Sequence, residues 1–268
     1  MEPFVALMRR YVVEYTNRHD TAVCAQIMAP GYTLRMGAHV LRGRDEHYVP
    51  AAAAQFRQFP GLGLTVHEIV TNGSELALRF SEHGASIRHG GRRAAWSGIG
   101  LYRWDGTRLL ENFVEQDYLS RRRQLAGGGP IPVPAPATAP WDERARPANP
   151  RAEAAVRAWI ADGMPGGTVR RDDGTAGPRL RDANSTIDVL FSAGEAVAFR
   201  VTQVGAYDGG LPETGAERGA REVRFHVVGL VHTEGDRVRG GHLVGNRLDV
   251  VRELERPADL PLPAGEPA

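Results

Sequence analysis

The residue types available to this chain limit its chemistry before any fold is considered. Its 33 basic residues are all arginine, so a lysine Schiff base, a pyridoxal phosphate anchor and the lysine of a phosphate-binding P-loop are excluded. Cys24 is the single cysteine, which excludes an intrachain disulfide, a zinc ribbon and an iron–sulfur site. A buried carboxylate remains as a group that can take and return a proton near neutral pH.

Histidines and glycines give no recognisable cofactor motif. The nine histidines are scattered, and none forms a His-Glu-x-x-His pattern or another spacing typical of metal ligands. Gly61-x-Gly63 and Gly98-x-Gly100 lack the third glycine of a dinucleotide-binding loop, and neither opens a predicted helix. We therefore predict no metal and no cofactor.

Charge and hydropathy argue against two classes of partner. The net charge is only +1, and we interpret the run Arg121–Arg123 as a solvated strand end, so no nucleic acid partner is expected. No apolar run reaches the length of about 18 residues that a membrane helix needs, and charges recur from Met1 to Arg18, unlike in a signal peptide. We predict a cytoplasmic protein without a membrane segment.

Composition divides the chain into four segments. At Gly127 the sequence changes to a run rich in glycine, proline and alanine, which is typical of a spacer. We predict a folded domain over residues 1–125, a linker over 126–150, a second domain over 151–256 and a flexible tail over 257–268.

The two predicted domains repeat one another. Ser97–Leu109 matches His226–Val238. The offset then stays constant, without a gap, as far as Leu125 in the first copy and Leu254 in the second. A gapless match across two strands and their turn indicates duplication rather than chance. The hairpin before this match, around Tyr207 to Arg221, is longer in the second copy.

Periodicity in the first copy predicts helices followed by strands. Apolar residues recur at spacings of three and four from Phe4 to Tyr15, as on one face of a helix. Asn72-Gly73 and Asp105-Gly106 are typical of tight hairpin turns. The predicted elements are helices at 4–15, 22–28 and 46–59, a short hairpin over 32–41, and strands at 64–71, 75–83, 93–104 and 107–118.

The second copy has fewer helices. Arg151–Ala161 is its one clear helix, and the segment from Asp162 to Ser185 is too short and too rich in glycine to hold two more. Helices followed by a curved antiparallel sheet indicate an α+β cone in each copy, with the second copy reduced.

This order of elements resembles the nuclear transport factor 2-like superfamily. Within it, the first copy is similar to the SnoaL-like polyketide cyclases and the ketosteroid isomerases. The segments that carry the resemblance are Arg10-Tyr11-Val12, Gly31-Tyr32-Thr33-Leu34, Leu41-Arg42-Gly43-Arg44 and Gly106–Phe113. The resemblance implies two tandem cone domains. It also implies a cofactor-independent cyclase, isomerase or dehydratase that acts on an apolar, oxygenated, polyketide-like molecule.

Most of the catalytic residues of these families are replaced here. Aligned on the resemblance, the acid–base Asp of the cyclases falls on Val114 and their His on Asn112. The general-base Asp of the isomerases falls on Met36, and the protonated Asp of their oxyanion hole on Gly100. The oxyanion-hole Tyr is kept, as Tyr11. Neither mechanism can therefore run unchanged.

The resemblance also indicates which strand residues point into the first cone, because side chains alternate between the two faces. The predicted pocket consists of Tyr11, Met36, Phe80, Glu82, Trp96, Asn112 and Gln116, with Tyr15 and His39 at its mouth. An apolar lining with a few polar groups is typical of a small-molecule site. A β-bulge that shifted the register by one residue would instead put Glu82 outside.

Glu82 is the one carboxylate that this prediction places inside, and its apolar surroundings are expected to raise its pKa toward the range useful for proton transfer. We predict Glu82 as the acid–base residue, Tyr11 as the group that stabilises developing negative charge, and Asn112 as a substrate-holding residue. The second copy has Gly241 at the position of Asn112, so the site is expected in the first copy alone. The alternative is a non-catalytic small-molecule-binding or scaffold protein, which the lost family acids favour.

The outward face of the first sheet is predicted to be buried. Its row Glu111, Phe113 and Glu115 mixes apolar and charged residues, and the second copy can cover it within the same chain. We predict an intrachain pseudo-dimer of two sheets packed back to back, with Phe113 and Leu243 between them. We predict that the protein binds a hydrophobic small molecule as its substrate. Whether two such chains also form a homodimer is left open by the sequence.

Overall fold

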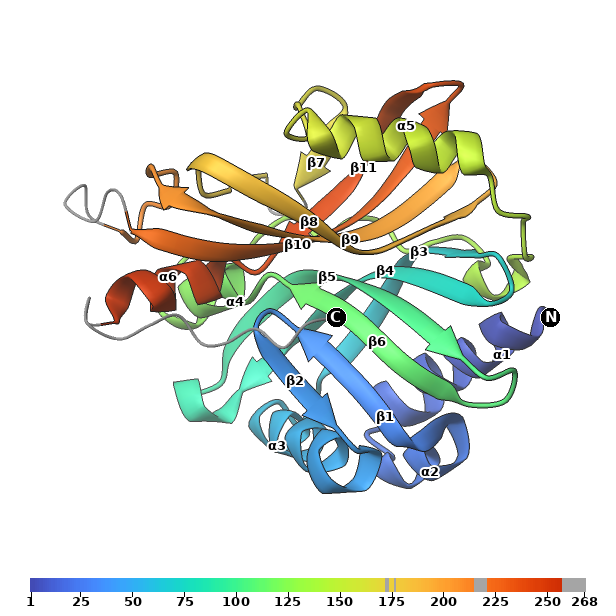
Figure 1. The fold of residues 1–268 in the computed structure, drawn as a ribbon. Helices are drawn as coiled ribbons and strands as arrows, with labels where there is room; N and C mark the ends of the chain where they lie inside the picture. Colours follow the sequence, from blue (N-terminus) through green and yellow to red (C-terminus); the bar gives the residue numbers. More distant parts are fainter. Residues whose placement is uncertain (172–173, 176, 215–220, 257–268) are drawn as a thin grey trace.

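The computed structural model describes residues 1–171, 174–175, 177–214 and 221–256, and it contains two mixed β-sheets with helices around them (Figure 1). The predicted α+β class is confirmed, but the sheets were predicted to be antiparallel and each contains one parallel pair, because the first strand of each half joins its sheet beside the last strand of that half. The predicted tail, 257–268, lies outside the described residues, as does part of the long hairpin expected around Tyr207 to Arg221.

The first sheet has six strands in the order β2-β1-β6-β5-β4-β3. They are β1 (Met28–Met36), β2 (His39–Arg42), β3 (Gly63–Thr71), β4 (Glu75–Ser86), β5 (Arg92–Trp104) and β6 (Leu109–Gln116). β1 and β6 pair in parallel, and the other neighbours are antiparallel. Gly73 and Gly106 have φ values of +93° and +94° at the two predicted hairpin turns, a conformation that favours glycine.

Helices cover the face of this sheet that points away from the second sheet (Figure 1). They are α1 (Pro3–Arg10), which continues as a π-helical turn (Tyr11–Thr16), a 3₁₀ turn (Thr21–Val23) leading into α2 (Cys24–Ile27), and a π-helical turn (Arg44–Tyr48) leading into α3 (Val49–Gln58). The apolar stripe from Phe4 to Tyr15 packs in one core with strand residues such as Leu78 and Val114. The predicted helix at 22–28 is shorter than expected, because β1 already begins at Met28.

The second sheet repeats the topology of the first. Its strands are β7 (Val169–Arg171), β8 (Leu180–Ala193), β9 (Ala196–Tyr207), β10 (Glu222–Glu234) and β11 (Arg237–Gly245), in the order β7-β11-β10-β9-β8. β7 pairs in parallel with β11 as β1 does with β6. One long helix, α5 (Pro150–Ala161), lies on its outer face (Figure 1). Within the described residues the second half has no counterparts of β2, α2 and α3, so it is the reduced copy.

The two sheets pack back to back. Their shared apolar layer consists of Val70, Ala77, Ile99, Leu101 and Phe113 from the first sheet and Val189, Phe191, Ala193, Ala196, Ala198, Val228, Leu230 and Val244 from the second. Phe113 lies in this layer as predicted. The placement of Leu243 was wrong: it lies in the core of the second half, because the repeat aligns it with the inward-pointing Val114. Its neighbour Val244 takes the interface position.

The segment after β6 is a helix, not the predicted strand end. β6 ends at Gln116, and Asp117 accepts a hydrogen bond from Ser120 N at 3.2 Å, which caps α4 (Tyr118–Leu125). Asn246 accepts from Asp249 N in the same way at the start of α6 (Arg247–Glu255). The capping residue was read as part of the strand, so Arg121–Arg123 were assigned to the wrong element.

The segment between the two halves runs along the edge of the first sheet. Ala137 N donates to Val66 O at 2.8 Å, and Arg146 N donates to Thr71 O at 2.9 Å. An edge strand whose backbone is bonded in this way is protected from pairing with other chains. The division into two domains and a linker stays a prediction. None of the helices in the described part is long and apolar enough to cross a membrane.

Candidate active site

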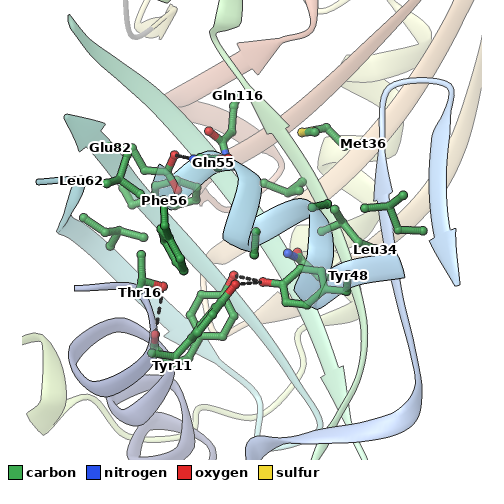
Figure 2. A pocket seen from close by; sticks show the side chains of 18 of the residues that line it. Tyr11, Thr16, Leu34, Met36, Tyr48, Gln55, Phe56, Leu62, Glu82 and Gln116 are labelled. Carbon is green, nitrogen blue, oxygen red and sulfur yellow. Dashed lines mark hydrogen bonds between the residues drawn. The ribbon is translucent and has the colours of Figure 1, made fainter. Parts of the chain in front are cut away.

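A cavity lies inside the first half, between the sheet and the helices that cover it (Figure 2). Its volume is about 130 Å³. The predicted site residues that line it are Tyr11, Tyr15, Met36, Phe80, Glu82, Asn112 and Gln116. Of these, Tyr15 was expected at the mouth, but its side chain is buried and bonded inside.

Two predicted pocket residues do not line the cavity. Trp96 points inward but is fully buried behind the wall, where it packs with Phe59. His39 pairs with Met36 across the β1–β2 hairpin, next to the turn, and its side chain is exposed. His39 is the first residue of β2, and its side chain faces solvent instead of the cavity.

Glu82 lies inside the cavity because the strand register around it is regular. β4 and β5 pair without a shift from Glu75 to Ser86, so the bulge that would turn Glu82 outward is absent from these strands. The side chain is 7% exposed, and the Gln55 amide N–H donates to its Oε2 at 2.8 Å. Burial raises the pKa of Glu82 to about 7, against the opposing effect of the Arg121 charge.

Trp96 fixes the orientation of the Gln116 amide. The indole N–H, which can only donate, donates to Gln116 Oε1 at 2.6 Å. The amide oxygen is therefore occupied, and the NH₂ group is the polar edge that Gln116 presents to the cavity. Figure 2 shows Gln116, Glu82 and Gln55 gathered at one end, which we call the carboxyl end.

Tyr11 and Tyr48 lie at the opposite end (Figure 2). Tyr15 joins them through a hydrogen bond to Tyr48, and we call these three tyrosines the phenol end. The Tyr15 hydroxyl donates to the Tyr48 hydroxyl at 3.1 Å, and the hydroxyls of Tyr48 and Tyr11 share a bond of 3.1 Å. Burial raises the pKa of each phenol well above its usual value, so all three stay neutral. Because Tyr15 donates to Tyr48, the Tyr48 proton can point at Tyr11. The Tyr11 hydroxyl also lies beside that of Tyr102, with which it can form a hydrogen bond.

Asn112 adds a hydrogen-bond acceptor to the lining. It is 1% exposed, and its Oδ1 accepts no hydrogen bond from the part of the chain that the structure describes. Buried polar atoms without a partner are rare in folded proteins, and a ligand hydroxyl would satisfy this one. Val114 and Met36, where the related families have acids, line the cavity with apolar side chains.

The cavity opens between α3 and the β1–β2 hairpin. The lining residues on these two elements are only partly buried or exposed, among them Leu34, Met36, Leu41 and Ala51. The lining residues at the far side, such as Tyr102 and Val114, are buried. The side chains at the opening are mainly apolar, so the outer part of the cavity is a largely hydrophobic surface.

Arg121 lies behind the carboxyl end. Its guanidinium carbon is 3.9 Å from the ring centroid of Tyr118 and 5.0 Å from that of Trp96, a cation–π arrangement. Trp96 in turn pairs with Glu82 across β4 and β5. The interpretation of Arg121 as solvated was therefore wrong: α4 turns it onto the aromatic wall, where its charge favours the ionised form of Glu82.

The sequence prediction missed Tyr48, Gln55, Phe56 and Tyr102, all of which line the cavity. Tyr102 lies an even number of residues after the inward-pointing Trp96 on one strand, and that alternation could have found it. Gln55 and Phe56 lie two helical turns after Tyr48, so all three residues share one face of the helix. The helix was predicted, but no face of it was assigned to the pocket.

Metal and thiol chemistry find little support in the described residues. No three His, Cys, Asp or Glu side chains there lie close enough together to hold a metal ion. Cys24 is buried, and burial raises the pKa of its thiol to about 12, which keeps it protonated.

Comparisons with known proteins support the resemblance for the first half. Residues 8–112 match the family model of the SnoaL-like domain, so the predicted similarity is confirmed for this segment. None of the curated proteins compared with the chain matches it.

Solved structures match about half of the chain. A candidate SnoaL-like polyketide cyclase from Jannaschia sp. CCS1 is 18% identical, covering 47% of this chain and 94% of its own, with a TM-score of 0.44. TsrD from Streptomyces laurentii is 24% identical, covering 46% and 94%, with a TM-score of 0.41. IdmH, a candidate polyketide cyclase from Streptomyces antibioticus, is 22% identical, covering 47% and 99%, with a TM-score of 0.40.

Proposed function

We propose, from the similarity of residues 8–112 to SnoaL-like domains, that this protein is a cofactor-independent acid–base enzyme acting on an apolar, oxygenated small molecule. The reaction is a cyclisation, isomerisation or dehydration, each of which moves protons next to a carbonyl or hydroxyl. Glu82 carries this proposal. It is the one carboxyl among the described lining residues, its pKa is about 7, and neutral phenols lie at the other end of the cavity.

Glu82 takes a proton from carbon and returns it at another position. Gln55 donates to its Oε2, and in this proposal Oε1 takes the substrate proton. A pKa near the ambient pH gives useful populations of both the base and the acid form, which a proton shuttle needs. The Gln116 NH₂ group is positioned by Trp96 to hold a substrate oxygen at the same end.

The phenol end stabilises the negative charge that develops on the substrate oxygen. Tyr11 donates to that oxygen, and its hydroxyl is polarised by the chain from Tyr15 through Tyr48. Asn112 accepts a hydrogen bond from a substrate hydroxyl through its otherwise unbonded Oδ1. Tyr11 and Asn112 are held in place by burial, so they need no rearrangement when charge forms.

The volume of the cavity limits what reacts inside it. An engineered protein cavity of about 150 Å³ holds benzene. A cavity of about 130 Å³ therefore accommodates one ring-sized group. The reacting ring lies inside, and the rest of a larger substrate lies along the apolar opening beside Leu34 and Met36.

Deuterium exchange tests this chemistry without knowledge of the product. We expect the protein to accelerate deuterium incorporation next to the carbonyl of 2-cyclohexen-1-one in D₂O, measured by NMR. Glu82→Gln keeps the shape and removes the base, so exchange should fall by ~10²–10⁴. Arg122→Gln, at an exposed position of α4, is the control and should exchange at the wild-type rate. Wild-type exchange in Glu82→Gln would remove Glu82 from the mechanism.

A non-catalytic binding protein is the second candidate, and Val114 and Met36 favour it because they replace the family acids with apolar side chains. This function predicts that 2-naphthol, a fluorescent two-ring phenol, binds in the cavity. It also predicts that 2-cyclohexen-1-one exchanges no faster with the protein than in buffer. Those two results together would select binding over catalysis.

A further inference from the structure

The second half of the chain reaches the wall of the first cavity at one point. The β1–β2 hairpin forms one side of the opening and turns at Gly37 and Ala38, and its tip points toward the second sheet (Figure 1). Arg200, on β9 of the second half, donates from a terminal guanidinium N–H to Gly37 O at 2.8 Å. A residue 163 positions away thus holds the turn beside Met36, which lines the cavity.

Arg200 is fixed by acceptors on several sides. Its Nε and one terminal N–H group donate to Glu115 Oε1 at 3.2 and 3.1 Å, and the other terminal group donates to Asp188 Oδ2 at 2.8 Å. Arg200 is 5% exposed and Glu115 is fully buried. His226 Nδ1 lies 3.0 Å from the guanidinium, and burial lowers the pKa of this histidine to about 2, so it stays neutral and can accept. A planar guanidinium bonded in this way has little freedom to move.

Gly37 is bonded from both sides of its peptide backbone. Its N–H faces both carboxylate oxygens of Glu115, at 3.0 and 3.1 Å, while its carbonyl accepts from Arg200. Its φ is +57°, and a Cβ at this position would collide with Asp249 Oδ2 and Asn246 Nδ2 of the second half. Glycine is therefore required twice, for the backbone conformation and for the close approach.

We propose that the second half is a positioning element for the first cavity: through Arg200 and Glu115 it fixes the tip of the β1–β2 hairpin and so controls how a ligand passes the opening. This inference rests on the proposed function in one respect, that the cavity takes up a ligand. Arg200 acts through Gly37 and is a positioning residue, not a catalytic one. The second half has Gln203 at the position of Glu82, so it lacks that carboxyl group. Positioning the hairpin is the role that we propose for it instead.

Hydrogen exchange of the Gly37 amide tests the anchoring in the wild-type protein without any ligand. An amide bonded to a buried carboxylate opens only when the surrounding structure opens. We expect Gly37 to exchange at least ~10³-fold more slowly than Gly106, the exposed turn glycine between β5 and β6. Equal exchange at the two turns would overturn the proposal, and this comparison holds even if an Arg200 variant fails to fold.

Arg200→Lys tests the link to the cavity. Lysine keeps the charge but cannot reproduce the planar fork, so the Gly37 amide should exchange ~10-fold faster or more while the amides of β5 stay protected. Stopped-flow fluorescence with 2-naphthol should show faster association and still faster dissociation, and an affinity ~3–10-fold weaker. Arg239→Lys, on an exposed ion pair with Glu234, is the matched control and should behave as wild type.

The outcomes separate this inference from the proposed function. If 2-naphthol fails to bind the wild-type protein, the cavity function fails while Gly37 exchange still reports on the anchoring. If 2-naphthol binds Arg200→Lys with unchanged rate constants although Gly37 has become exposed, the hairpin does not control the opening and the proposal is wrong.

Discussion

The two halves of this protein have the same strand order and different interiors. In the first sheet Glu82 pairs with Trp96 across two neighbouring strands. At the equivalent place in the second sheet, Gln203 pairs with Phe225. The pair therefore supplies a carboxyl group and an indole N–H in the first half, and neither of these groups in the second.

The neighbouring strand extends the contrast. Asn112 and Gln116 of the first half correspond to Gly241 and Gly245 of the second. The Phe225 ring lies so close to Gly245 that a Cβ there would collide with it. Where the first half presents an amide to a cavity, the second half fills the space with an aromatic ring.

The two halves therefore differ in whether their interior contains a cavity or a packed core. A cavity with buried polar groups costs stability, because desolvated groups and missing contacts are unfavourable. The second half, with Phe199 and Phe225 in a closed apolar core, provides packing and an interface instead. The cavity thus lies in one copy of the repeated fold, and the other copy has a packed apolar core.

The largest difference between the two interiors is expected in the stability that each loses when an aromatic ring is removed. Phe199 is fully buried, and Phe199→Ala should destabilise the protein by about 3–5 kcal/mol because a cavity remains in a closed core. Phe56 lines the existing cavity and is partly exposed, so Phe56→Ala should cost only about 1–2 kcal/mol. Urea unfolding of both variants measures the difference, and equal losses would show that the second core is not the better packed.

Stability as a function of pH sharpens the contrast between Glu82 and Gln203. The pKa of Glu82 in the folded chain is about 7, above its ordinary value of 4.5. The unfolded chain therefore loses this proton at lower pH, and the stability that the group contributes is full below about pH 4.5 and lost as the pH rises through about 7. Glu82→Gln should equal the wild type near pH 4 and exceed it by about 2–3 kcal/mol near pH 8. A difference independent of pH, in urea unfolding at both values, would contradict the burial of an ionisable Glu82.

The junction between the halves can be tested at its closest approach. Gly37→Ala combines a left-handed backbone position with a collision against Asp249 and Asn246, and should cost about 2 kcal/mol. Gly106→Ala is the matched control, because Gly106 also has a positive φ but has open space around it, and should cost about 1 kcal/mol. Thermal unfolding measures the stability of both variants. An equal loss of stability would mean that the second half does not pack closely against the hairpin tip.

How far the sequence predicted this molecule depends on whether a signal was local. The hairpin turns at Gly73 and Gly106 follow from local turn chemistry, and the structure has them. The inward direction of Glu82 follows from strand alternation together with the family resemblance, which indicated the face that points into the cone, and the structure has it too. Leu243 was assigned to the interface because it is hydrophobic, without using the alternation of side chains along its strand, which puts it on the inner face. The start of α4 was missed because Asp117 reads equally well as a strand residue and as a helix cap.

Contacts between distant segments left no pattern in the sequence. Arg200 and Gly37 are 163 positions apart, and nothing in the composition near either predicts their bond. Gln55 bonds Glu82 from a helix whose position was predicted but whose inward face was not assigned. The roles of the cavity residues in catalysis remain predictions, since placement in a cavity does not by itself assign a chemical step.

The smallest effect is expected from Trp96→Phe, which gives the first half the residue type that the second half has at this position. Trp96→Phe copies the second half, where Phe225 has no N–H to donate, and removes the 2.6 Å bond to Gln116 Oε1. We expect a loss of about 1 kcal/mol in urea unfolding, since one buried hydrogen bond is lost and the Gln116 amide can rotate to a new partner. That rotation would turn the amide NH₂ group away from the ligand, and Trp96 also interacts with Glu82 by a hydrogen bond. Deuterium exchange into 2-cyclohexen-1-one should therefore fall several-fold although the Glu82 side chain is kept. Trp159→Phe removes an indole N–H from an exposed bond to Pro165 O in the second half, and it should change neither quantity appreciably. If Trp96→Phe left deuterium exchange unchanged, the orientation of Gln116 would not matter to the reaction, and the carboxyl end would reduce to Glu82 and Gln55.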